Sequence, residues 1–205
     1  MKTTPATNKT IPTITLQLDL DVTTKFTALL QSSFEVETKS GEPLLSFLEQ
    51  LPGFTAEYID KEVQTILMNG EPVDDVYTPL KEPGTVIALS AVVPGLGVMG
   101  AMFRKGSIHS TTVHTTYQES GPQTPDRKIT INLKLFNYIA RARGTEILRK
   151  GIRISTKTLL TFFQTRPWLL EQIETITIDD IHTHDTEALV QVLQHTNHCH
   201  FALTN

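Results

Sequence analysis

The chain repeats one series of short motifs, with its two copies 115 residues apart. ITLQLDL at residues 14–20 corresponds to ITINLKL at 129–135, with four of seven positions identical, and LLSFLEQLP at 44–52 corresponds to LLTFFQTRP at 159–167. Further along, the spacing drifts but the order holds, since TILMNG and TVIAL in the first copy correspond to TITIDD and CHFAL in the second. Two motifs in one register favour two copies of one fold, although strand-like runs also resemble one another by composition alone.

A chain of 205 residues is long enough for two domains that each bury a core. The repeat predicts a first module over residues 13–100 and a second, divergent module over 128–205. Between them, residues 101–127 are expected to form a glycine-hinged segment and linker, because this stretch is rich in serine, threonine and histidine.

Hydrophobic periodicity predicts the same order of elements in each module: two strands, a helix and two strands. In the first module the strands are expected at 14–20, 34–38, 63–68 and 85–93 and the helix at 42–51, with the first two strands paired antiparallel. In the second module the strands are expected at 129–136, 151–155, 174–178 and 199–203 and helices at 158–166 and 186–195. This order is typical of a β-grasp, in which one main helix packs on a mixed sheet whose first and last strands lie side by side. The predicted fold class is therefore α+β, with two ubiquitin-like β-grasp modules in tandem.

Two stretches resemble the MoaD/ThiS branch of the ubiquitin-like β-grasp family, the small sulfur carriers of molybdopterin and thiamine synthesis. ILMNGEPVDDVYTPLKEPGTVIALSAVVPG resembles the turn, loop and last strand of that family, and ITINLKLFNYIARARG resembles its opening strand. The resemblance implies a final strand that leads into a Gly-Gly tail, whose carboxylate an adenylating enzyme activates and converts to a thiocarboxylate.

The chain departs from that pattern at the tail. After Val93 the first module continues into PGLGVMGAMFRKGS without a Gly-Gly, and the second ends in HFALTN. Because adenylation needs a free carboxylate on a thin, glycine-containing tail, the carrier activity would require proteolytic processing near residues 95–106. The alternative is that this apolar, glycine-rich segment binds a protein partner. The candidate tail or partner-binding residues are Gly95, Leu96, Gly97, Val98, Met99, Gly100, Met102, Phe103 and Arg104.

Charge is divided unevenly between the two copies. Residues 13–100 carry thirteen acidic and four basic side chains, whereas residues 101–205 carry nine acidic and twelve basic ones. Such a division steers the modules toward each other or toward neighbouring copies, although both charge groups can equally be solvated faces. The candidate basic patch consists of Arg141, Arg143, Arg149, Lys150 and Arg153.

Other candidate chemistry has a plainer explanation at each position. GLGVMG at 95–100 matches the dinucleotide-binding pattern GxGxxG, but no strand–helix–strand context surrounds it. His182, His184, His195, His198, Cys199 and His200 could supply zinc ligands, but their spacing is equally typical of exposed or core-edge histidines. We therefore assign no catalytic residue, metal or cofactor.

The sequence thus predicts a non-enzymatic protein that acts through protein–protein interaction and assembles with copies of itself, with a processed sulfur carrier or protein modifier, activated by an adenylating enzyme, as the alternative. The net charge of −4 gives no electrostatic reason to expect nucleic acid as a partner. Since no apolar run is long enough to span a membrane and the single cysteine cannot form an internal disulfide, a soluble cytoplasmic protein is expected.

Overall fold

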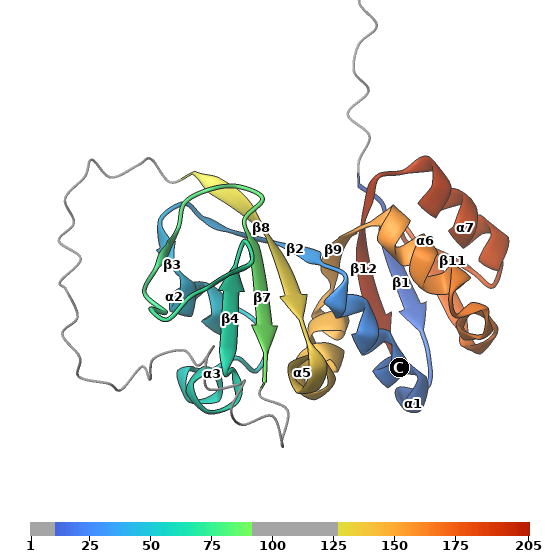
Figure 1. The fold of residues 1–205 in the computed structure, drawn as a ribbon. Helices are drawn as coiled ribbons and strands as arrows, with labels where there is room; N and C mark the ends of the chain where they lie inside the picture. Colours follow the sequence, from blue (N-terminus) through green and yellow to red (C-terminus); the bar gives the residue numbers. More distant parts are fainter. Residues whose placement is uncertain (1–10, 92–126) are drawn as a thin grey trace, which may run out of the picture.

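The computed structural model describes residues 11–91 and 127–205, and their strands form one large mixed sheet and a small second sheet (Figure 1). The large sheet contains β1 (Thr13–Gln17), β2 (Phe34–Lys39), β4 (Thr65–Met68), β5 (Glu71–Pro72), β7 (Val86–Ser90), β8 (Lys128–Leu135), β9 (Ile152–Ser155), β10 (Thr175–Ile178), β11 (Ile181–Thr183) and β12 (His198–Thr204). In the small sheet β3 (Glu42–Pro43) pairs with β6 (Pro79–Leu80).

The helices are α1 (Leu20–Thr23), α2 (Leu44–Glu49), α3 (Ala56–Glu62), α5 (Asn137–Lys150), α6 (Thr156–Gln164) and α7 (Thr186–His195), with 3-10 helices η1 (Thr24–Gln31) and η3 (Pro167–Gln172). The predicted helix at 186–195 has the bounds of α7, and α2 and α6 lie within or close to the predicted ranges. α3, α5 and η1 were not predicted from the sequence.

The α+β class is confirmed, but the strands form one continuous sheet and not two separate ones. Its order is β11-β10-β1-β12-β9-β2-β8-β7-β4-β5. We call β2, β8, β7, β4 and β5 the first half and β9, β12, β1, β10 and β11 the second half. The two halves meet at the β2–β9 pair, which we call the junction.

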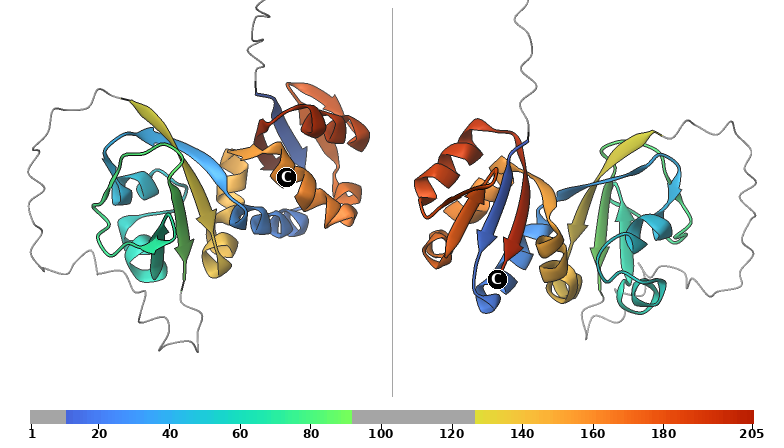
Figure 2. Two further views of the ribbon diagram at one scale, coloured as in Figure 1. Left: turned by 45° about the horizontal axis from the view of Figure 1, so that its top comes forward. Right: turned by 180° about the vertical axis from the view of Figure 1, so that it is seen from behind.

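The two strands of the best-conserved repeat motif lie in each other's half. The prediction that β1 pairs antiparallel with β2 is wrong, because β1 pairs parallel with β12 and antiparallel with β10. In the same way β8 lies between β2 and β7. Figure 1 shows β1, in blue, among the red and orange elements and β8, in yellow, beside the green β7, and both views of Figure 2 agree. The first and last strands of each repeat are therefore not neighbours.

The physical reason is that the two strands carry the same pattern. Alternate residues of β8 are fully or almost fully buried, as are Ile14 and Leu16 of β1. Either strand can therefore fill a central position in either half of the sheet. The alternation within each strand does not determine which half it enters. The module boundaries at 13–100, 101–127 and 128–205 follow the repeat in sequence and stay a prediction.

One face of the sheet carries the core, and the other is polar. The interior residues of β8, β12 and β7 alternate strictly with partly or fully exposed ones such as Thr130, Asn132 and His200. This alternation is typical of a sheet with one face against the core and one toward solvent. On the core side, α5 packs against η1 and contacts β12 of one half and β7 and β8 of the other, so the interior continues beneath the junction.

Candidate functional site at the junction of the sheet

The two halves of the sheet are joined by a single backbone bridge, between Glu35 of β2 and Arg153 of β9. The Glu35 carboxylate contacts two basic side chains on the polar face: Arg153 Nε lies 2.9 Å from its Oε2, and His198 Nε2 lies 3.0 Å from its Oε1. The Arg153 contact is an ion pair without the alignment of a hydrogen bond. Because the three side chains come from β2, β9 and β12, they hold the junction together at one point.

Beyond this bridge β2 has an open edge. Ser40 N–H donates to Arg127 O, so the even-numbered residues of β2 exchange hydrogen bonds with β8, and the backbone of Glu37 faces the opposite side. Its counterpart across the junction is Gly151, which has a φ of +91° and donates its N–H to Ile147 O at the end of α5. Gly151 therefore turns away from β2, and beyond Glu35 no strand in the described part of the chain pairs with the edge of β2 opposite β8.

A cleft of about 310 Å³ opens where the strands separate. Its walls are the backbone and side chains of β2 and β9, and residues of both sheet faces reach into it. The apolar side is formed by Leu51, Pro52 and Ile147, and the polar side by Thr130 and His200. Lys150 also lines the cleft and donates from Nζ to Gln50 O at 3.3 Å. The cleft thus combines an open strand edge with one apolar and one polar wall.

The predicted basic patch is divided among different surroundings. Lys150 and Arg153 line the cleft. Arg141 and Arg143 line a separate, shallow depression of about 600 Å³ with Tyr58 and Tyr138.

Arg143 is the most constrained of these cations. Its guanidinium lies 4.3 Å from the centre of the Tyr58 ring and 3.6 Å from a carboxylate oxygen of Glu146. Burial raises the pKa of the Tyr58 phenol, and Arg143 opposes that shift. Arg149 is exposed in the last turn of α5. α5 therefore lies against residues of the first copy, Tyr58 and η1 among them.

The candidate tail residues, from Gly95 to Arg104, lie outside the described residues. β7, which precedes them in sequence, ends at Ser90 in the middle of the first half.

The histidines and the cysteine are dispersed among different contacts. His182 bonds to Thr177 Oγ1, His184 to Glu174 O and His195 to Gln191 O. Cys199 points into the core, opposite to its strand neighbours, and burial raises the pKa of its thiol to about 12. Across residues 11–91 and 127–205, no three acidic, histidine or cysteine side chains lie where they could hold a metal ion.

Comparison of the chain with protein-family models, curated proteins and solved structures found no match. Among the helices that the structure describes, none has the length and apolar composition needed to cross a bilayer.

Glu35 and Glu37 were not predicted as site residues. The alternation in FEVET identified the strand, but no local signal shows that its neighbour on one side is a strand more than 110 residues away that pairs only once.

Proposed function

We propose that this chain is a non-enzymatic, β-grasp-like protein that works by binding other polypeptides. The pairing within the first half supports the β-grasp assignment: β2–β8 is antiparallel, β8–β7 parallel, and β7–β4 and β4–β5 antiparallel. This is the pattern of a β-grasp in which the opening strand comes from the other repeat. The second half shows the same series of pairings, but with β12 and not β1 beside β9.

The observation that carries the binding function is the open edge of β2 in the junction cleft. An extended segment can add to such an edge, because the Glu37 N–H and C=O face the cleft and are not used by β8. Successive side chains of an added strand point to opposite faces. They would meet Leu51 and Pro52 on one side and Thr130 and His200 on the other. The expected ligand is therefore a short extended segment with alternating apolar and polar residues.

The experiment compares two substitutions at Glu37. Glu37→Pro removes the N–H that faces the cleft and leaves the bonds to β8, whereas Glu37→Ala removes only the side chain. Peptides selected from a random display library on the wild-type chain are expected to bind Glu37→Ala normally and Glu37→Pro at least about tenfold more weakly. The melting temperatures serve as the folding control. Equal binding to the proline variant, at unchanged thermal stability, refutes strand addition at this edge.

The alternative is the sulfur-carrier function, and the position of β7 supports it. β7 lies beside β8 in the place of a final β-grasp strand, and the glycine-containing sequence follows it. Intact-mass measurement on protein from its native source separates the two functions. A species that ends within residues 95–106, or one that carries a thiocarboxylate, would replace the binding proposal.

A further inference from the structure

A groove with two cations runs between η1 and α6 in the second half. It has a volume of about 310 Å³, and Lys157 and Arg166 are the charged residues among those described that line it. The rest of the lining is formed by hydroxyl-bearing and apolar side chains: Ala28, Ser32, Thr158, Thr161, Phe162 and Thr165. Since no carboxylate neutralises the cations within the described lining, the groove favours an acidic occupant.

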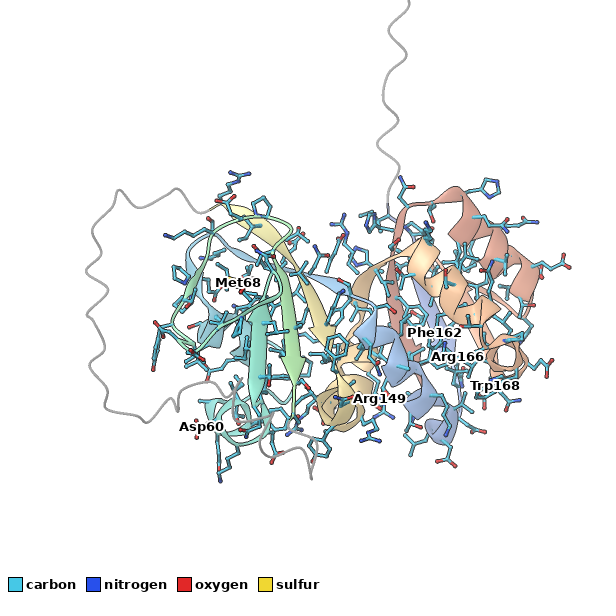
Figure 3. The ribbon with its side chains drawn as sticks, in the orientation of Figure 1. Asp60, Met68, Arg149, Phe162, Arg166 and Trp168 are labelled. Atoms are coloured by element: carbon cyan, nitrogen blue, oxygen red, sulfur yellow. The ribbon has the colours of Figure 1, made fainter. Side chains whose placement is uncertain are left out.

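One aromatic ring lines the groove, and a second aromatic side chain follows closely in sequence. The Arg166 guanidinium lies 4.6 Å from the centre of the Phe162 ring, so its position is fixed by that ring. Two residues further on, Trp168 is 46% exposed, which is unusual for so large an apolar side chain. Figure 3 shows Phe162, Arg166 and Trp168 together on one side of the molecule. Exposed tryptophan beside arginine is the composition that protein interfaces favour.

The first half carries a loop of complementary chemistry. Glu71 of β5 is exposed, as are Asp74 and Asp75 on the segment between β5 and β6, and Tyr77 is 38% exposed on that segment. Met68, which pairs with Glu71, lies in the opposite half of the molecule from Trp168 (Figure 3). The acidic loop therefore cannot reach the groove of its own chain, but it can reach that of a second copy.

The spacing of the charges also agrees. Lys157 and Arg166 are nine residues apart along α6 and its end, or about 13 Å at 1.5 Å per residue. Glu71 and Asp75 are four residues apart and can be separated by at most about 14 Å. The loop is therefore long enough, at its maximum reach, to span the two cations.

We propose that the acidic loop at Glu71–Tyr77 of one copy docks into the η1–α6 groove of the next. This contact joins different surfaces of the two copies, so it is heterologous and generates rings or open chains of molecules. The partner is a second copy of this chain. The inference uses surfaces other than the junction cleft, so it stands or falls independently of strand addition at β2.

The test uses charge reversal in the full chain, followed by light scattering after size-exclusion chromatography. The wild type is expected to associate with rising concentration at low salt and to dissociate at high salt. Arg166→Glu and Asp74→Lys are each expected to weaken association at least about tenfold, because each places like charges at the contact. Arg127→Glu makes the same charge change at an exposed position outside both the groove and the basic patch, and it is expected to leave association unchanged.

The decisive arm is a mixture of the two reversed variants. Arg166→Glu presents an acidic groove, and Asp74→Lys presents a basic loop, so the mixture is expected to recover association that neither variant shows alone. Recovery supports a direct contact between these two surfaces. A wild type that stays monomeric at every concentration and salt, or a mixture that stays monomeric, overturns the proposal. If the wild type is monomeric but the Glu37→Pro effect on peptide binding holds, only the self-contact is wrong.

Discussion

Separating the two sequence copies should leave neither of them folded. If the chain is expressed as residues 1–100 and 101–205, the first fragment lacks β8, which lies between β2 and β7. The second fragment lacks β1, which lies between β12 and β10. Two modules built in chain order would instead fold separately, so the split distinguishes the exchanged arrangement from a simple tandem.

The size of the effect follows from what β8 and β1 bury. β8 contributes Ile129, Ile131, Leu133 and Leu135, each at most 3% exposed. At about 1.5–3 kcal/mol for each buried aliphatic side chain, their loss costs roughly 6–12 kcal/mol. This is as large as the whole stability of a typical domain, about 5–15 kcal/mol. β1 contributes Ile14 and Leu16, both fully buried, so its loss costs roughly 3–6 kcal/mol.

The assay is circular dichroism and NMR on each fragment alone and on an equimolar mixture. Each fragment alone is expected to show little chemical-shift dispersion and no cooperative thermal transition. The mixture, or the two fragments produced together, is expected to recover both and to elute as one species, because each fragment supplies the strand that the other lacks. A fragment 1–100 that unfolds cooperatively by itself, with a dispersed spectrum, would falsify the exchange of β1 and β8.

Two further predictions concern the core. Gly144→Ala should lower the free energy of unfolding by up to about 2 kcal/mol in a urea titration. The added Cβ would lie 2.9 Å from Thr27, and overpacking of about 1–3 kcal/mol opposes a gain of about 1 kcal/mol in helix propensity. An increase in stability contradicts the close η1–α5 packing. Cys199 should resist thiol reagents at pH 9 in the native protein and react fully in denaturant, since burial raises the pKa of its thiol from 9.0 to about 12. Between pH 9 and pH 12 the thiol is deprotonated in the unfolded state but not in the folded state. The stability contributed by this group is therefore present below pH 9 and falls as the pH rises. Rapid labelling of Cys199 in the native protein would contradict the burial of its thiol.

Local signals predicted the elements well where the pattern is strong. The period of two identified β1, β8 and β12, and the Leu-Leu-x-Phe motif identified α2 and α6. Asn69 and Gly70, between β4 and β5, both have positive φ, as the Asn-Gly pair favours in a two-residue turn. These features depend on neighbours along the chain, so the sequence specifies them.

The missed elements lack such a signal. Among its fourteen residues, α5 has four arginine and lysine residues and a glycine, and its apolar stripe is short. This composition is typical of a charged, exposed stretch and does not indicate a helix that packs in the core. Its burial comes from η1, β12 and β7, which lie on both sides of the junction. Which strands β1 and β8 pair with also depends on residues far away in the sequence. The two strands have the same alternation of apolar and polar residues, so their own sequences do not determine it. The candidate cleft could not be predicted for the same reason, since it exists only where strands from the two copies meet.

The structure also explains how a cleft can exist in the middle of a continuous sheet without separating its halves. The chain crosses the junction twice, through α1 and η1 between β1 and β2 and through α5 between β8 and β9. These crossing segments pack on each other closely enough that Gly144 has no room for a Cβ beside Thr27 and Leu30. The halves are therefore held by exchanged strands and by helix packing on the core side, in addition to the single Glu35–Arg153 bridge. Because β2 and β9 pair only at that bridge, the edge of β2 beyond Glu35 is available to a partner strand while the core-side packing holds the halves together.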